Sequence, residues 1–107
     1  MPDDAPPASG DGRTRLEQLR RQIDELDRRI VGLLNERATL GREVGREKAA
    51  LGWSQVRDPE REREVLLRVT IANEGPIAQE DLLAIYGRLI QATRALEDRD
   101  RERETSR

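Results

Sequence analysis

The sequence predicts an all-α protein made of three helices, the first of them very long. Apolar residues recur at alternating steps of three and four between residues 14 and 51, which is helical spacing. No proline interrupts residues 14–58, and two later segments carry their own helix start and stop signals. No segment shows the alternation of apolar and polar residues that a half-buried strand needs.

The first predicted helix runs from about 14 to 51, which is roughly 55 Å at 1.5 Å per residue. Its seam repeats as a heptad through Leu16, Leu19, Ile23, Leu26, Ile30, Leu33, Arg37, Leu40, Val44, Glu47 and Leu51. A helix this long favours pairing with another long helix. Gly41 and Gly45 either permit a close helix approach or are simply tolerated.

The two shorter helices are bounded by turn and cap signals. Gly52 ends the first helix, and Trp53 in the loop that follows is expected to act as an apolar plug. Asp58 and Pro59 then provide an N-cap and a first helical residue. This second helix stops at 73–76, and a third runs from about 79 to the late 90s.

The ends of the chain differ in composition from the helical part. Residues 1–13 hold three of the five prolines and no large apolar residue after Met1, which predicts a disordered N-terminal tail. Residues 98–107 are almost wholly charged and predict a fraying, charged C-terminal tail. The helical domain is therefore expected over 14–97.

The composition excludes several kinds of chemistry. The chain has 107 residues, 39% of them charged, and neither His nor Cys. Disulfides, thiolate nucleophiles, His-based catalysis and ordinary zinc sites are therefore excluded. The formal charge of −2 does not favour a nucleic-acid partner, and no stretch is apolar enough to span a membrane. The N-terminus also lacks the apolar core of a signal peptide, so we expect a cytoplasmic protein.

Two seam positions of the first helix, where apolar residues are expected, carry the charged residues Arg37 and Glu47. Arg37 pairs with Glu47 of an antiparallel partner, extends to the surface, or faces an anionic ligand. Lys48 leaves the helix on the same face, roughly 16 Å from Arg37, so the two side chains can bracket a small anion. Arg20 is about 25 Å from Arg37, too far to share a site with Lys48 on its own helix. If two such helices pair in antiparallel fashion with their midpoints near residue 33, however, Arg20 of the partner subunit falls between Arg37 and Lys48.

Two further clusters have both an ordinary and a functional interpretation. Asp58 to Glu62 is a well-capped, solvated helix start or part of a binding wall. Thr93 and Glu97 lie one turn apart on the apolar face of the third helix. Their ordinary interpretation is a hydroxyl bonded back to its own helix and a surface carboxylate.

The chain resembles the all-helical (AroQ class) chorismate mutases over roughly residues 15–97. The resemblance is carried by Leu19-Arg20-x-x-Ile23-Asp24-x-Leu26-Asp27, Leu33-Leu34-x-x-Arg37, Val44-Gly45-x-x-Lys48 and Asp58-Pro59-x-Arg61-Glu62, together with Asn73-x-Gly75-Pro76 and Thr93. Members of that family are intertwined homodimers that convert chorismate to prephenate in phenylalanine and tyrosine biosynthesis. The resemblance therefore implies an intertwined antiparallel homodimer for this chain. The reaction is an intramolecular Claisen rearrangement that needs no metal and no cofactor.

The resemblance implies a role for each matched residue. Arg37 and Arg20 of the partner subunit would bind the two carboxylates of chorismate, and Lys48 would donate to its ether oxygen. The wall near the ring hydroxyl would come from Asp58, Arg61 and Glu62. Thr93 would hydrogen-bond a carboxylate. Glu62 would accept the hydrogen bond of the hydroxyl, and Arg61 either lines the wall or orients Glu62.

Glu97 departs from the many family members that carry Gln at this position as a second donor to the ether oxygen. An ionised carboxylate cannot donate a hydrogen bond. We therefore expect Glu97 to act in its protonated form, with activity favoured at acidic pH, or else to lie outside the site.

Two alternative functions remain open from the sequence. An isochorismate pyruvate lyase uses the same scaffold, although the complete Asp58–Glu62 block favours the mutase. A non-catalytic, ligand-binding or regulatory dimer is the other, and the charge at Arg37 counts against a purely structural one. A complex with another enzyme of the aromatic pathway is a further expectation.

Overall fold

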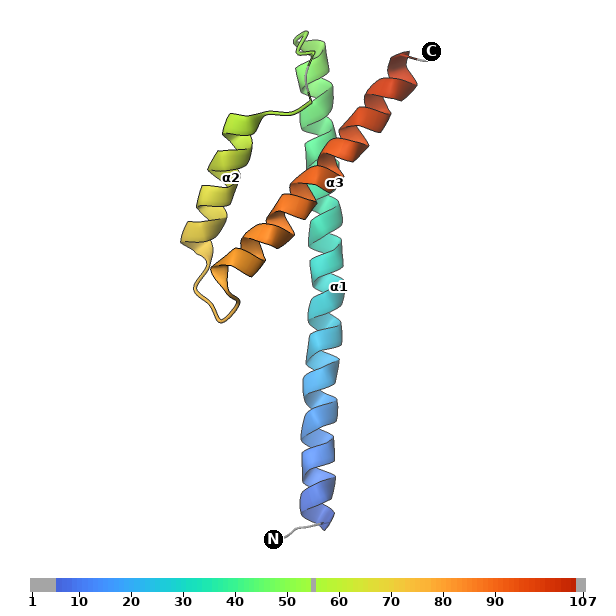
Figure 1. Ribbon diagram of the computed structural model, residues 1–107. Coiled ribbons are helices and arrows are strands. Elements are labelled where there is room, and N and C mark those ends of the chain that lie inside the picture. The colour runs from blue at the N-terminus through green and yellow to red at the C-terminus, as the bar shows by residue number, and fades with distance from the viewer. Residues whose placement is uncertain (1–5, 55, 106–107) are drawn as a thin grey trace. The chain divides into compact units, whose positions relative to one another are not determined.

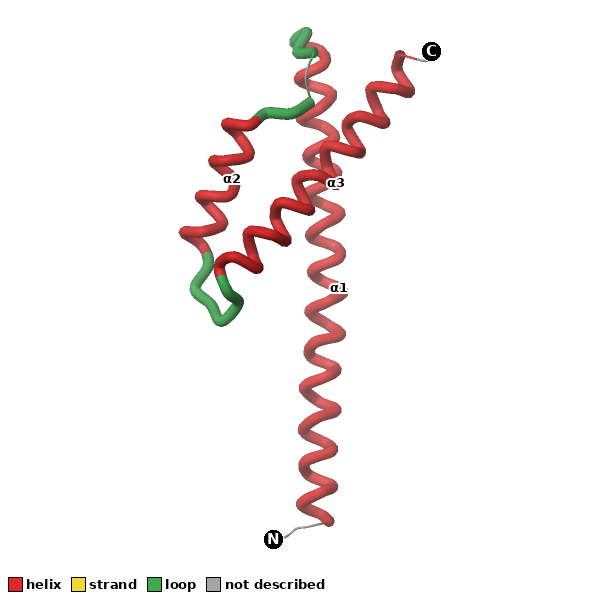
Figure 2. Tube along the Cα trace, in the orientation of Figure 1, coloured by secondary structure: helices red, strands yellow, loops and turns green. Residues whose placement is uncertain are grey.

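The structure, a computed structural model, describes residues 6–54 and 56–105, with side chains from Gly12 onward. It contains three helices, α1 (Pro6–Ala50), α2 (Pro59–Ala72) and α3 (Gln79–Thr105) (Figures 1 and 2). No strand occurs in these described ranges. The predicted all-α architecture of three helices with a very long first helix is confirmed.

Helix α1 begins earlier than its apolar seam. The seam predicts a start near 14, whereas the helix starts at Pro6 and includes most of the predicted N-terminal tail. Proline is tolerated in the first helical turn, where its missing N–H has no intrahelical partner to lose. Residues 1–5 of that tail lie outside the described residues. At the other end, the backbone N–H of Trp53 bonds the Lys48 carbonyl at 2.9 Å, and Gly52 adopts a φ of 83°.

The chain divides into two compact units, residues 1–35 and 36–107. The described part of the first unit is the portion of α1 up to Asn35, and its apolar seam residues are exposed, with Ile23 at 55% and Leu33 at 60%. No large apolar side chain in the described part of the chain is buried. The described protein therefore has no hydrophobic core of its own, and its apolar seam is unpartnered.

The second unit contains the end of α1 with α2 and α3. Helix α2 starts as the sequence predicts: Pro59 opens it, and the Asp58 carboxylate accepts a hydrogen bond from the Arg61 backbone N–H at 3.2 Å. Helix α2 packs against α3 after a turn in which the Asn73 amide contacts the Gln79 side chain at 2.9 Å. Helix α2 thus begins where its capping residue places it, and α3 begins at Gln79 as the sequence predicts.

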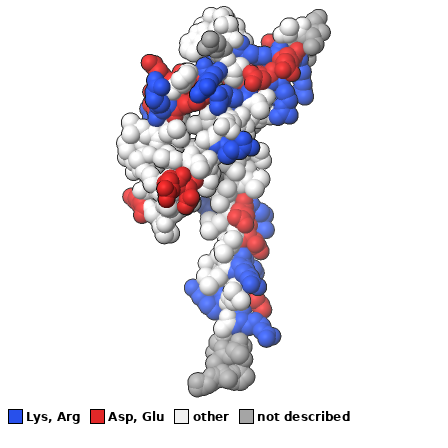
Figure 3. Space-filling model, in the orientation of Figure 1, with Lys and Arg blue, Asp and Glu red and all other residues white. Residues whose placement is uncertain are grey.

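Helix α3 continues well beyond its predicted end. It reaches Thr105, so residues 98–105 are helical instead of forming a charged tail. Figure 3 shows Lys and Arg side chains interleaved with Asp and Glu at this end of the helix. An ion pair with an earlier part of the chain stabilises the extension, because both Asp100 carboxylate oxygens accept hydrogen bonds from Arg42 at 2.8 and 2.9 Å. No helix in the described ranges has the length and apolar character that crossing a membrane requires.

Candidate active site

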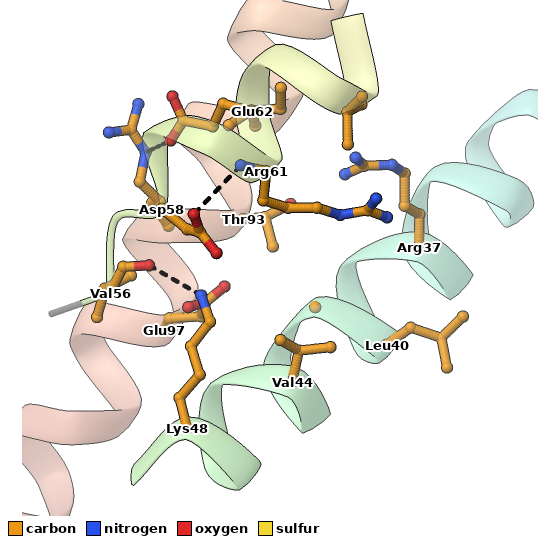
Figure 4. A pocket seen from close by; sticks show the side chains of 14 residues that line it. Arg37, Leu40, Val44, Lys48, Val56, Asp58, Arg61, Glu62, Thr93 and Glu97 are labelled. Carbon is orange, nitrogen blue, oxygen red and sulfur yellow. Dashed lines mark hydrogen bonds and ion pairs between the residues drawn. The ribbon is translucent and has the colours of Figure 1, made fainter. Parts of the chain in front are cut away.

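A pocket of about 300 Å³ lies within the second unit and is lined by all three helices (Figure 4). Its charged and hydroxyl-bearing lining comprises Arg37, Lys48, Asp58, Arg61, Glu62, Thr93, Arg94 and Glu97. The rest of the wall is apolar or small and comprises Leu40, Gly41, Val44, Val56, Val65 and Ile90. A dense set of charges in an apolar frame suits a small, multiply charged ligand.

Two arginines lie at one end of this pocket. Arg37 is half-buried, and its guanidinium carbon lies 5.8 Å from the centroid of the Tyr86 ring, within cation–π range. Arg61 extends from α2 toward Arg37 in Figure 4. Arg61 also pairs with Glu64 on its own helix, so it keeps a surface contact while lining the pocket. The pair offers two planar guanidinium groups, which suit carboxylate ligands.

Lys48 lies at the opposite end, near Glu97. Its ammonium group donates to the Val56 carbonyl at 3.1 Å, and Figure 4 shows it beside the Glu97 carboxylate. The Val56 contact ties Lys48, at the end of α1, to the segment that precedes α2. An ammonium group has three donors, so Lys48 can keep this bond and still donate to a ligand.

Glu97 is the most unusual group in the pocket. Its side chain is 7% exposed, and its Oε2 atom is buried with no hydrogen-bond partner among the described residues. Burial raises the pKa of the Glu97 carboxyl above its ordinary value, and the charges of Lys48, Arg101 and Arg94 oppose that rise. Glu97 therefore holds its proton to higher pH than a solvated glutamate does.

Glu62 is oriented by arginines other than the one that the sequence suggests. Its carboxylate lies 3.6 Å from Nε of Arg94 on α3 and 3.8 Å from Nε of Arg57. Its side chain is only 19% exposed, so these pairs lie partly out of water. Of the two roles that the resemblance implies for Arg61, lining the wall or orienting Glu62, the structure has it in the pocket lining and paired with Glu64. Arg94 and Arg57 therefore position the Glu62 carboxylate in this structure.

Helix α3 approaches α1 closely at two glycines. A Cβ atom added at Gly41 would lie 2.3 Å from the Thr93 methyl carbon, and one at Gly45 would lie 3.0 Å from Cγ of Glu97. Of the two interpretations that the sequence allows for these glycines, the structure supports close approach over simple tolerance. The approach places Thr93 and Glu97 in the pocket wall.

The hydroxyl of Thr93 bonds to its own helix. It donates to the Leu89 carbonyl at 3.0 Å, which is the ordinary interpretation of this residue. To donate to a bound carboxylate, the hydroxyl would have to give up that bond. In this structure Thr93 contributes to the wall mainly through its methyl group, which packs over Gly41.

The structure brings together all but one of the residues proposed from the sequence. Seven line the pocket: Arg37, Lys48, Asp58, Arg61, Glu62, Thr93 and Glu97. Arg20 belongs to the first unit and is not part of this lining. Sequence reasoning missed Val56, because it acts through its backbone carbonyl and its side-chain type carries no signal. It also missed Arg94, which nothing in the pattern separates from the neighbouring surface charges.

Comparison with known proteins places this chain in a family. A model of the chorismate mutase type II family matches residues 19–98. The bifunctional chorismate mutase/prephenate dehydratase of Aquifex aeolicus is 38% identical over 86 residues, covering 77% of this chain and 24% of that protein. The chain thus spans about a quarter of that bifunctional relative. The chorismate mutase of Methanocaldococcus jannaschii is 32% identical over 84 residues, covering 78% of this chain and 84% of that protein.

The fold agrees with the sequence comparison. Form II of the chorismate mutase structure from Thermus thermophilus superposes with a TM-score of 0.76 at 36% identity, covering 79% of this chain and 96% of that one. Form I of the same enzyme gives a TM-score of 0.70 at 35% identity, covering 74% of this chain and 98% of that one. The family match, the relatives and the shared helical arrangement agree, and we conclude that the chain belongs to the chorismate mutase type II family.

Proposed function

We propose that this protein rearranges chorismate to prephenate. The observation that carries the proposal is the layout of the pocket, with two guanidinium groups at one end and Lys48 beside a buried Glu97 at the other. Chorismate has two carboxylates and an ether oxygen. This layout offers cations to the carboxylates and hydrogen-bond donors to the ether oxygen. The relatives named for chorismate mutase support the same conclusion.

The reaction asks for shape and fixed charge more than for reactive groups. Within one molecule the ether C–O bond breaks while a C–C bond forms, so no proton or electron is exchanged with the protein. Negative charge grows on the ether oxygen in the transition state. Lys48 and protonated Glu97 would donate hydrogen bonds to that oxygen, and donors fixed in advance lower the barrier without having to reorganise. Arg37 would hold a carboxylate and so select the folded substrate conformation.

The pocket wall formed by the start of α2 would bind the ring hydroxyl. Glu62 is held by Arg94 and Arg57 and so offers a fixed acceptor. Oδ1 of Asp58 accepts the α2 cap hydrogen bond, which fixes the orientation of this carboxylate in the wall. In this proposal Glu62 accepts the hydroxyl hydrogen bond, while Asp58 and Arg61 shape the wall.

We also propose that the working protein is a homodimer in which Arg20 of the partner subunit completes the pocket. The exposed apolar seam of α1 and the absence of buried large apolar side chains in the described chain support a second copy. The seam begins at Leu16, and Arg20 directly follows its second member, Leu19. Pairing would cover the seam and bring a further guanidinium to the ligand. The bifunctional relatives join two activities in one chain, which favours an assembly with another aromatic-pathway enzyme.

The pocket predicts a pH dependence that Glu97→Gln removes. Because burial raises the pKa of Glu97, the wild type should keep a donor at low pH and lose kcat/KM as pH rises through that pKa. The Gln amide donates at every pH, so the variant should be flatter and more active than the wild type near pH 8. Rate profiles between pH 5 and 8 check this, and two identical profiles would refute the role of Glu97.

Glu97→Gln should also stabilise the fold, and more so as the pH rises. A carboxyl whose folded-state pKa is raised stabilises the fold below its unfolded pKa and loses that contribution as pH rises. Glu97→Gln should therefore raise Tm more at pH 8 than at pH 5. A Tm difference independent of pH would mean that Glu97 is not held protonated by the fold.

Product analysis tests the proposed function directly. Purified protein is incubated separately with chorismate and with isochorismate, and the products are identified by chromatography. Prephenate from chorismate is the expected result. Pyruvate released from isochorismate would favour a lyase on the same scaffold. Turnover of neither compound would contradict both activities and favour a non-catalytic binding module.

A further inference from the structure

The end of α3 lies beyond the family match yet contacts the segment that leads into the pocket. The match ends at residue 98, whereas α3 continues to Thr105. Asp100 and Arg101 in this extension make long-range polar contacts. The extension is therefore part of the tertiary structure, although the shared family pattern does not describe it.

Asp100 fixes the extension to α1. Both of its carboxylate oxygens accept hydrogen bonds from Arg42, at 2.9 Å from Nε and 2.8 Å from Nη2. Such a two-point contact constrains orientation as well as distance. The hydrogen bond from Arg42 also lowers the pKa of the Asp100 carboxyl, so the pair stays ionised at neutral pH. Arg101 is the next residue, and this anchor sets its position.

Arg101 holds the backbone that follows α1. Its Nη1 donates to the Trp53 carbonyl at 2.9 Å, and its Nε and Nη2 are buried with no hydrogen-bond partner among the described residues. A buried donor left unpaired costs free energy. The Arg101 charge also acts on Glu97, where it opposes the rise in the Glu97 pKa. The Trp53 side chain is 50% exposed, which is unlike the apolar plug that the sequence suggests. Polar contacts of its backbone, and not burial of its ring, hold Trp53.

Trp53 and Lys48 are connected in two ways. The Trp53 N–H bonds the Lys48 carbonyl at 2.9 Å. Three residues after Trp53, the Val56 carbonyl accepts the Lys48 ammonium at 3.1 Å. Trp53 therefore contacts Lys48 at its backbone carbonyl, and Val56 contacts it at its ammonium group.

We propose that Arg101 is a positioning residue, which holds the backbone of Trp53 and Val56 so that the Lys48 ammonium stays directed into the pocket. Asp100, bound to Arg42, fixes the helix that carries it. The inference rests on the proposed function only for its effect on rate. The geometric part, from Arg101 through Trp53 to Lys48, can be observed without substrate.

The chain contains a natural probe at each end of this connection. Trp53 is its only tryptophan and Lys48 its only lysine. Intrinsic fluorescence therefore reports on the loop, and a ¹³Cε-lysine label gives one NMR signal from the pocket. Arg101→Met removes the donors but keeps an aliphatic stem, and Arg99→Met, an exposed residue of the same helix, is the matched control.

In Arg101→Met, Trp53 should become more accessible to acrylamide, the Lys48 signal should shift, and kcat should fall about tenfold with a smaller change in KM. Arg101→Lys, which keeps one charged donor, should recover part of each effect, and Arg99→Met should show none. Unchanged Trp53 and Lys48 signals in Arg101→Met would overturn the proposal, and so would a loss of kcat without a Lys48 shift.

A second variant distinguishes a loss of positioning from a folding defect. Arg42→Met leaves Arg101 in place but removes the anchor at Asp100, and it should shift the Trp53 and Lys48 signals in the same direction by less. If neither variant shifts them, the connection does not exist. A wild type that makes no prephenate contradicts the proposed function but leaves the two spectroscopic results to decide the geometry.

Discussion

Arg37→Ala is expected to lower kcat/KM for prephenate formation by about 10²–10³-fold, the loss typical of a missing charge-stabilising donor. Arg37 is the cation that the apolar seam does not explain, and it lines the pocket from α1. Its removal takes away a planar partner for a carboxylate and leaves the substrate less constrained. Steady-state rates with chorismate measure the loss.

The control for this variant is an arginine outside the pocket. Arg63→Ala on the exposed face of α2 has the same change in charge and should keep wild-type rates. The circular dichroism of Arg37→Ala should remain that of a folded helical protein, because Arg37 is only half-buried. A drop of less than tenfold in a folded Arg37→Ala would mean that Arg37 does not bind the substrate.

Gly41→Ala is expected to cause the largest combined loss of stability and rate. The new Cβ would lie 2.3 Å from the Thr93 methyl carbon, so Thr93 must rotate or α3 must move away. Rotation of this stiff side chain disturbs its bond to the Leu89 carbonyl. Overpacking of this kind costs about 1–3 kcal/mol, against about 1 kcal/mol gained from alanine in a helix. A shift of about 1 Å in the pocket wall can lower the rate about 10²-fold.

Removing the clashing methyl group should rescue that variant. In Gly41→Ala/Thr93→Ser the hydroxyl remains while the methyl carbon is gone, so Tm and kcat should both return toward the wild type. Gly87→Ala on α3 is the matched control, because nothing lies within 4 Å of its added Cβ, and it should be neutral or stabilising. Equal effects of Gly41→Ala and Gly87→Ala, measured by thermal melting, would exclude a tight contact at Gly41.

The sequence predicted the elements that depend on local patterns. The Asp58-Pro59 start of α2 follows directly from capping chemistry, and the structure has it at that position. The ends of α1 and α3 were placed less well, since a seam of apolar residues says where a helix packs and not where it stops. The polar end of α3 is helical to Thr105, with an ion pair between Asp100 and the distant Arg42.

Most of the candidate site could also be predicted, because charges in an apolar seam stand out. Arg37 stands out in this way, Lys48 is linked to it by lying on the same helix face, and the resemblance adds the acidic wall. Contacts made by the backbone could not be found: the Val56 carbonyl and the Trp53 carbonyl act regardless of their side chains. The choice of Arg94 over Arg61 as the partner of Glu62 depends on how α2 packs against α3.

The central claim is that chorismate is rearranged in a pocket shared by two copies of the chain, and subunit complementation tests it most directly. Arg20→Ala and Arg37→Ala should each be nearly inactive alone. Refolded together in equal amounts, about half of the dimers are mixed, and each mixed dimer has one pocket with both arginines. Prephenate formation should then recover to about a quarter of the wild-type rate. A mixture no more active than the average of its two parents would contradict the shared pocket.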